Sequence, residues 1–547
     1  MKKKLFKVLA VAFAAVLSLS VFTACGEKAE SNNKPVDNTK TQLYVGVSDG
    51  GYGQKWINDL IERFEAVYTD IQVWPTFEKD LFSDTSLYMN MASRSEDLYF
   101  VSAITYQNYI NSGLLADMTD LVTTPMNESP YVTSDETESI EGKLCDDTLR
   151  DYYKTSDEKY YAIPFTHAFF GLVYDVDLFD AKRLYFNQDG TGFITSLDQP
   201  RSLGPDGKTG LEGNVDYSAD DGLPSNIDQL KTLFDRMVDI GVTPMTWNGK
   251  NTNYMERYLM SLWADYEGEY NFNLNNTFEG EYTFAGESNP TPINQSNAYL
   301  LQRQKGKAHA LEIAKLIASN PDYYSKNALL PSQTHILAQD EFLTSTLTNE
   351  PIAMLVDATW WENEASGIFS EMADLGGSGY AKGQRRFAFL PTPKAEGASQ
   401  NTTLLSVSGH SVAMISANTT KLEAAKKFIA FAHTDANLAA FTKETGVIRP
   451  FNYEIPQQDL DTMTPFAKSI FNVYNRPDTD VVYNTVYSAP ARINMPSYFV
   501  DWSWGAELSG GPTKEPIKAF REDKNLTVAQ YVEGMVKMYD DWKTVIG

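Results

Sequence analysis

The chain has 547 residues, a formal net charge of −26 at pH 7, five histidines and two cysteines. So acidic a chain lacks the basic face that nucleic-acid binding requires, and its few histidines and cysteines give little material for a transition-metal site. A chain of this length exceeds what one hydrophobic core supports, so two or more lobes are predicted.

Residues 1–24 have the pattern of a secretory signal peptide, with four lysines before the apolar run 8–22. Without those lysines the net charge of −26 becomes −30. Phe22-Thr23-Ala24-Cys25 resembles a bacterial lipobox, which implies a lipid on Cys25 followed by a polar tether over residues 25–41. The alternative is an ordinary signal peptide in which Cys25 is incidental. Cys145 then has no partner, so no structural disulfide is expected, and no later segment suits a membrane span.

Strands and helices alternate along the first part of the chain, which predicts a mostly parallel sheet. Strands are expected at 43–47, 71–75 and 97–101, and helices at 56–67 and 83–93. The glycine-rich loop 48–53 lies between the first strand and its helix, where open α/β sheets place ligand contacts. Its spacing fits neither a dinucleotide fingerprint nor a P-loop.

The stretch from Asp357 to Trp361 combines a carboxylate, a hydroxyl and two indoles after the apolar run 352–356, which predicts a buried strand. Indole faces suit the C–H faces of a sugar ring, and polar groups fix its orientation. The alternative is that both tryptophans fill a core. Because adjacent helical residues point about 100° apart, both indoles cannot face one core equally well, and at least one of them is predicted to line a binding cleft.

Two polar segments, 186–222 and 266–297, are predicted to be insertions. Carboxylates in the first could hold Ca²⁺, but their spacing fails the EF-hand pattern, so ordinary surface loops are favoured and no cofactor is expected. Near the C-terminus, Thr527 and Gln530 predict a capping box. Trp502 and Trp504 lie outside any periodic element and form either an exposed aromatic surface or packing contacts.

Several segments, in order, resemble the family 1 extracellular solute-binding proteins, the sugar-capturing components of ABC importers. Tyr109–Thr119 is similar to the family's "sGLL-pLt" segment, Lys159–Phe165 to "GKvYgiP", and the stretch 356–364 to "aaMt-ngsWa". The order of these segments implies that this stretch lies at the cleft edge, with Trp360 stacking on a ligand and Trp361 packed behind it. Further similar segments are 171–179, 223–230, 387–393, 404–415, 420–432 and 437–450.

The resemblance implies an α/β, two-lobed, type II periplasmic-binding-protein-like fold, with a ligand cleft between lobes joined by crossing strands. Lobe one would hold 42–163 plus 386–450, and lobe two 164–385 plus 451–547. The hinge would lie near Ile163, Arg386 and Pro450. Closure of the hinge on a ligand that touches both lobes would be the binding mechanism.

Ligand contacts are expected where the family's strands deliver loops to the cleft. The candidates are Asp49, Tyr52, Glu78, Tyr106, His167, Phe169, Trp247, Asp357, Trp360, Trp361, His410, Arg449, Trp502 and Trp504. For His167 and His410 the alternative is a local hydrogen bond, for Arg449 an acid partner, and for Tyr106 packing.

The implied function is that of a monomeric, lipid-anchored binding protein on the extracellular face of a Gram-positive cell membrane. It would deliver an oligosaccharide to the permease subunits of an ABC importer. Val101–Thr105 stand where maltodextrin-binding relatives carry Trp-Ala-His-Asp-Arg, which argues against a maltodextrin ligand. The alternatives are a surface glycan-binding or sensor lipoprotein without transport, and a binder of a non-sugar solute such as a peptide or polyamine.

An enzyme is not expected. Gly409-His410-Ser411-Val412-Ala413 approaches a nucleophile elbow, but its final glycine is missing and Ser411 opens a strand-like run. A glycosidase, which needs only two carboxylates, is the remaining enzymatic alternative.

Overall fold

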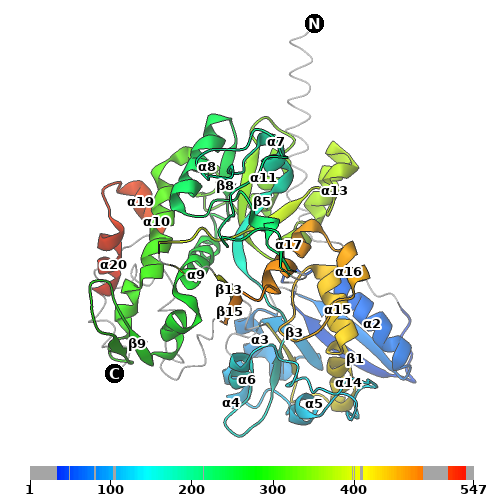
Figure 1. The fold of residues 1–547 in the computed structure, drawn as a ribbon. Coiled ribbons are helices and arrows are strands. Elements are labelled where there is room, and N and C mark those ends of the chain that lie inside the picture. The colour runs from blue at the N-terminus through cyan, green and yellow to red at the C-terminus, as the bar shows by residue number, and fades with distance from the viewer. Residues whose placement is uncertain are drawn as a thin grey trace.

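The computed structural model describes residues 34–48, 50–78, 82–102, 106–212, 215–396, 398, 401–406, 411–483 and 515–537. Two sheets, each with its own helices, build two lobes (Figure 1). The blue and cyan strands lie with the yellow helices in one lobe, and the green elements form most of the other. The predicted two-lobed α/β architecture is therefore confirmed.

The sheet of lobe one has the strand order β2-β1-β3-β14-β4. Its strands are β1 (Thr41–Val47), β2 (Ile71–Phe77), β3 (Leu98–Ser102), β4 (Ala162–Pro164) and β14 (Ser411–Ile415). β1 pairs in parallel with β2 and β3, as the alternation of strand and helix predicts, whereas β14 runs antiparallel to β3 and β4.

Helices cover this sheet with their apolar faces. They are α2 (Lys55–Val67), α3 (Asp84–Asn90), α4 (Tyr106–Asn111), α5 (Thr119–Thr123), α6 (Asp147–Tyr153), α14 (Leu422–Ala432) and α15 (Asp435–Thr445). α2 buries the apolar residues that its helical spacing places on one face, and its Phe64 ring lies 4.9 Å from that of Phe428 in α14. Two segments more than 350 residues apart in sequence, α2 and α14, thereby share one core.

The sheet of lobe two has the strand order β12-β5-β11-β8. Its strands are β5 (Phe170–Asp175), β8 (Thr243–Thr246), β11 (Ile352–Ala358) and β12 (Phe387–Leu390). All seven residues of β11 are buried, in keeping with the apolar run that predicted this strand. A Cβ at Gly171 would lie 2.1 Å from the ring of Phe389, so only glycine lets β12 pack here against β5.

Helices lie on both faces of this second sheet. They include α7 (Val176–Lys182), α8 (Ile227–Asp239), α11 (His335–Ser345), α12 (Trp361–Glu364), α13 (Ser366–Gly376) and α17 (Pro465–Tyr474). α16 (Gln457–Thr462) lies beside α15 of lobe one, and α17 contacts β12.

Strand β12 corrects a predicted boundary. The family resemblance implies that 386–450 belongs to lobe one, but Phe387–Leu390 is hydrogen-bonded to β5 in the sheet of lobe two. The chain enters the sheet of lobe one only at β14, after β13 (Thr402–Ser406) has paired with β15 (Thr479–Tyr483). The second crossing therefore lies after residue 390, and not near Arg386.

A helical subdomain extends lobe two. It contains α9 (Asn253–Thr277), α10 (Lys305–Ser319), α19 (Pro516–Glu522), α20 (Val528–Val536) and the hairpin of β9 (Gly280–Tyr282) and β10 (Thr291–Ile293). α9 continues to residue 277, so the predicted insertion at 266–297 begins within a helix, which kinks at Gly268. The capping box of Thr527 and Gln530 at the start of α20 is confirmed.

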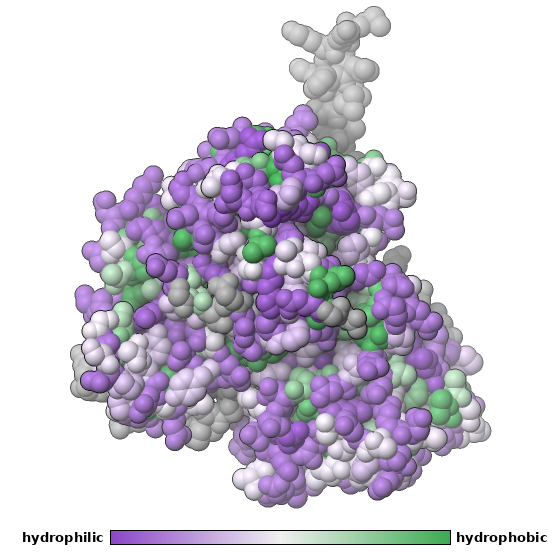
Figure 2. All heavy atoms as spheres, viewed as in Figure 1, coloured by the Kyte–Doolittle hydropathy of each residue, from purple (hydrophilic) through white to green (hydrophobic). Residues whose placement is uncertain are grey.

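On the face shown in Figure 2 the surface is mainly hydrophilic, with hydrophobic residues in small separate patches. Of the helices that the structure describes, none is long and apolar enough to span a bilayer.

Candidate functional site

Three crossing segments lie side by side between the lobes. Residues 165–169 join β4 to β5, and the backbone N–H of His167 donates to the carbonyl oxygen of Ile448 at 2.8 Å. Phe169 forms a β-bridge with Ser406 at the end of β13. The hinge predicted near Ile163 and Pro450 thus coincides with two of the crossings, and the third passes through Ser406.

Trp360 lies where the two lobes meet. It follows β11 and precedes α12, and its side chain is half-buried. Its indole meets the ring of Tyr52 in lobe one edge-on at 6.4 Å and the ring of Phe170 in lobe two edge-on at 5.5 Å. A Cβ at Gly51 would lie 2.7 Å from Cδ1 of Trp360, so the glycine-rich loop after β1 contacts the indole directly.

Tyr52 connects this contact to the hinge. Its hydroxyl lies 3.0 Å from Oγ1 of Thr166, in the first crossing segment. Burial raises the pKa of Tyr52, and the carboxylate of Glu364 raises it further. Glu364 belongs to α12 of lobe two, so its charge reaches a side chain of lobe one.

Two carboxyl groups of lobe two share one donor. The side-chain amide nitrogen Nε2 of Gln339, on α11, lies 3.0 Å from Oδ2 of Asp357 and 2.8 Å from Oε2 of Glu364. Burial raises the pKa of Asp357 well above its usual value, and the neighbouring Glu364 adds to this effect. Gln339 is fully buried, and its Oε1 has no hydrogen-bond partner.

Aromatic rings stand beside this carboxyl pair. Tyr254, on α9, packs edge-on against Phe170 at 5.3 Å and stacks on the imidazole of His335 at 6.1 Å. Nε2 of His335 lies 3.2 Å from Oε1 of Glu364. The guanidinium of Arg257 lies 5.3 Å from the centre of the Phe170 ring. The site therefore combines apolar ring surface with hydrogen-bond acceptors, the combination that suits a ligand with C–H faces and polar edges.

Of the predicted site residues, the structure brings Tyr52, Asp357 and Trp360 together. Trp361 is fully buried among the rings of Phe342, Phe369, Phe387 and Phe466. The prediction that it packs behind Trp360 is confirmed, and because its ring is fully buried the prediction that it contacts the ligand is wrong.

Other predicted residues lie in the interior. Trp247 packs against Tyr324 at 5.2 Å, and Phe169 packs against His167 at 5.8 Å. Burial lowers the pKa of His167 to about 3, so this imidazole is neutral at physiological pH. These side chains shape lobe two and the hinge and are buried away from solvent.

Arg449 is also fully buried, in the crossing that contains Ile448. Its guanidinium lies 4.2 Å from the centre of the Phe165 ring, and its Nη2 lies 3.2 Å from Nε2 of His433. Aromatic rings and an imidazole thus surround it in place of the acid considered as an alternative. Burial lowers its pKa to about 9.

Two of the remaining predicted residues lie in lobe one, and the others lie outside the described residues. Glu78 is exposed just after β2, and Tyr106 is the first residue of α4. Asp49, His410, Trp502, Trp504 and the proposed lipidation residue Cys25 lie outside the described residues.

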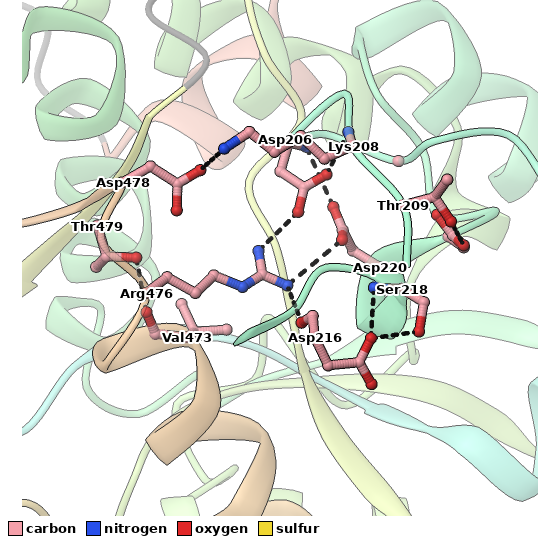
Figure 3. A network of polar contacts seen from close by, with 12 residues as sticks. Asp206, Lys208, Thr209, Asp216, Ser218, Asp220, Val473, Arg476, Asp478 and Thr479 are labelled. Carbon is pink, nitrogen blue, oxygen red and sulfur yellow. Dashed lines mark hydrogen bonds and ion pairs between the residues drawn. The ribbon is translucent and has the colours of Figure 1, made fainter. Parts of the chain in front are cut away.

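Two acidic side chains of the insertion at 186–222 pair with the guanidinium of Arg476 (Figure 3). Nη1 of Arg476, which precedes β15, lies 2.8 Å from Oδ2 of Asp206, and its Nη2 lies 3.7 Å from Oδ1 of Asp220. All three side chains are buried. Burial and Asp206 raise the pKa of Asp220 to about 8. In the part of the chain that the structure describes, no group of three His, Cys, Asp or Glu side chains could hold a metal ion.

Sequence reasoning missed several residues of the site: Thr166, Phe170, Tyr254, Arg257, His335, Gln339 and Glu364. Glu364 could have been predicted from the sequence, because it ends the same acidic and aromatic stretch that contains Asp357. Tyr254 and Gln339 come from separate helices, and no local pattern marks them as neighbours of β11.

Comparison with known proteins gives a family and a fold. The family model described as "Bacterial extracellular solute-binding protein" matches residues 50–439. A search of curated protein sequences finds no significant match.

Among solved structures, the chain is similar to a "Chitin oligosaccharide binding protein" at 14% identity and a TM-score of 0.54, covering 92% of this chain and 99% of that one. It is similar to RafE in complex with raffinose at 12% identity and a TM-score of 0.54, covering 92% and 100%. The apo form of RafE from Streptococcus pneumoniae is also similar, at 13% identity and a TM-score of 0.53, covering 93% and 100%. The solute receptor AcbH, whose description states an exclusive preference for b-D-galactopyranose, matches at 13% identity and a TM-score of 0.55, covering 93% and 100%. At these identities the likeness shows the shared fold.

Proposed function

The chain belongs to the bacterial extracellular solute-binding proteins, and we propose that it captures an oligosaccharide between its two lobes and delivers it to the permease of an ABC importer. The observation that carries this proposal is the half-buried Trp360 between Tyr52 of lobe one and Phe170 of lobe two, beside the carboxyl pair of Asp357 and Glu364. Such a site offers ring faces to the C–H surface of a sugar and acceptors to its hydroxyl groups.

Hinge closure would couple binding to transport. Tyr52 and Trp360 contact each other across the lobes, so a ligand seated beside them would touch both lobes. A ligand shifts a conformational equilibrium only by its difference in affinity for the two states, and contacts to both lobes exist only in the closed state. The three adjacent crossings near His167, Ser406 and Ile448 support such a hinge.

The anchor and the cellular location of the proposal rest on the N-terminal sequence. A lipid on Cys25 and the tether 25–41 would hold the protein as a monomer at the extracellular face of the cell membrane, next to its permease subunits. We propose no enzymatic activity and no cofactor. A surface glycan-binding or sensor lipoprotein without transport is the alternative that a transport assay distinguishes.

Calorimetry against a panel of mono-, di-, tri- and tetrasaccharides tests the proposed ligand class. We expect binding of at least one oligosaccharide, with a rise in melting temperature, because a ligand that binds only the folded state stabilises it. Binding of monosaccharides alone would contradict the oligosaccharide assignment. Uptake of the bound sugar by cells, compared with cells lacking this protein, then separates an importer component from a surface binder.

A further inference from the structure

A cavity lies on the insertion at 186–222 and shares no residue with the inter-lobe site. Its volume is about 570 Å³, within the range of about 300–1,000 Å³ that is typical of small-molecule sites. All of its described lining residues come from the segment 187–200. Most of their side chains are exposed, so the cavity is open to solvent.

One wall of the cavity is the aromatic ring of Phe193. This ring stacks on the buried ring of Phe186 at 4.8 Å, and the backbones of the two residues form an antiparallel β-bridge. The backbone N–H of the next residue, Ile194, donates to the carbonyl oxygen of Tyr185 at 2.9 Å. Phe193 itself is half-buried, so the part of its ring that is not packed on Phe186 gives the cavity a fixed apolar surface.

Hydrogen bonds also fix the loop around the cavity. The backbone N–H of Asn187 donates to the carbonyl oxygen of Gly192 at 2.8 Å, and Oδ1 of Asn187 accepts from the N–H of Gly192 at 3.2 Å. Nε2 of Gln229, on α8, donates to the carbonyl oxygen of Gly190 at 3.1 Å. The loop is thus attached to a helix of lobe two, and a ligand would not have to order it on binding.

Two amide side chains of the cavity have hydrogen-bonding groups that the described chain does not use. Oε1 of Gln199 accepts from the backbone N–H groups of Thr195 at 2.7 Å and Ser196 at 3.4 Å, whereas its Nε2 has no acceptor among the described residues. The side chain of Gln188 is exposed and has no hydrogen-bond partner in the part of the chain that the structure describes. Both amides line the cavity, so their free groups are available to a ligand there.

We propose that this cavity is a second carbohydrate site, which binds a neutral polysaccharide independently of the inter-lobe site. The Phe193 ring suits the C–H face of a sugar, and the two amides suit its hydroxyl groups, because an amide both donates and accepts. Asp189 is the only ionisable side chain among the described lining residues, which disfavours an anionic ligand. An open cavity admits one ring of a long chain, whereas a site between closing lobes has to enclose its ligand. The site goes beyond the proposed function, because holding a polymer requires no transport.

Affinity electrophoresis of the mature protein tests this second site. The native gels contain glycogen, arabinoxylan, galactomannan or xyloglucan, and the retardation of the protein gives a dissociation constant for each polymer. We expect at least one polymer to retard the protein. Phe193→Ala should bind that polymer about tenfold more weakly, as the loss of a central aromatic contact does. Gln188→Ala should bind it about threefold more weakly, because one hydrogen-bonding side chain is lost. Trp360→Ala should be retarded like the unmodified protein.

Leu197→Ala is the matched control, because Leu197 is an exposed residue of the same loop that does not line the cavity. Gln188→Ala removes no contact that the fold uses, so it decides the matter if Phe193→Ala fails to fold. Absence of retardation in all four polymers, unchanged retardation of Gln188→Ala, or loss of retardation in Trp360→Ala would overturn the inference and leave the proposed function standing. If calorimetry finds no oligosaccharide whose binding depends on Trp360, while a polymer still retards the protein through Phe193, the proposed function alone is overturned.

Discussion

Replacement of Trp360 by alanine should weaken ligand binding without unfolding the protein. The indole is half-buried, lies outside the apolar clusters that fill the interior of lobe two, and packs only against the edge of the lobe-one cluster. Its ring contacts are edge-on to Tyr52 and Phe170, and such aromatic pairs contribute about 0.5–1.5 kcal/mol each. The loss to the unliganded protein is thus about 1–3 kcal/mol, and it falls on the contact between the lobes and on the edge of the lobe-one core, against which the indole packs.

The substitution should also weaken the affinity for the ligand. If the indole stacks on a sugar ring, its removal costs about 1–3 kcal/mol of binding free energy, which raises Kd about 5- to 150-fold. Isothermal titration calorimetry with the oligosaccharide found in the panel measures Kd, and differential scanning calorimetry measures the melting temperature of the same preparation.

Trp74→Ala is the matched control. Trp74 is a half-buried tryptophan on β2 of lobe one, where its Nε1 donates to Gln42 at 2.7 Å. We expect the control to change stability slightly and Kd not at all. A collapse of the melting temperature of Trp360→Ala, with unchanged affinity in the folded fraction, would refute the reasoning and place Trp360 in the core.

Three further predictions concern the interior. Trp361→Ala should lower the free energy of unfolding by about 3–5 kcal/mol in urea denaturation, because the ring is fully buried; a stability within 1 kcal/mol of the unmodified protein, roughly the effect of a surface change, would contradict this. Arg476→Met should destabilise by about 3–5 kcal/mol, because Asp206 and Asp220 lose their buried cation, and the loss should shrink in Asp206→Asn. Burial raises the pKa of Glu267 to about 7 from 4.5, so its favourable contribution is complete below pH 4.5 and disappears as the pH rises through 7. Between pH 4.5 and 8, Glu267→Gln should therefore remove about 3 kcal/mol of pH dependence from the free energy of unfolding, and equal slopes for both proteins would show that Glu267 is not the titrating group.

The sequence predicts the fold where a pattern is local. The seven buried residues of β11 are an uninterrupted apolar strand, and the β1, β2 and β3 segments alternate with helical ones. Which sheet a strand joins is not a local property. β12 belongs to lobe two because Phe389 fits over Gly171 of β5, a contact across more than 200 residues that neither segment reveals alone. α9 likewise continues beyond Gly268 because Phe272 and Leu274 are buried by other elements, which overrides the weak helix propensity of its Asn residues.

The candidate site likewise contains residues that a local sequence pattern marks and residues that only the fold brings near them. Asp357, Trp360 and Glu364 occur within eight residues, and the sequence placed the first two at the cleft because a strand end that carries a carboxylate and indoles is a local signal. The groups around Asp357 come from distant parts of the sequence. The amide of Gln339 on α11 joins it to Glu364, and Tyr254 on α9 and Phe170 on β5 form the wall beside it. Tyr52 is the corresponding residue on lobe one, and the glycines beside it predict its loop. The structure shows why Gly51 is required there, since any side chain at this position would collide with Trp360. Each lobe therefore carries one predicted ligand contact that a local sequence pattern marks, Tyr52 in lobe one and Trp360 in lobe two, whereas the groups beside these contacts are brought there only by folding.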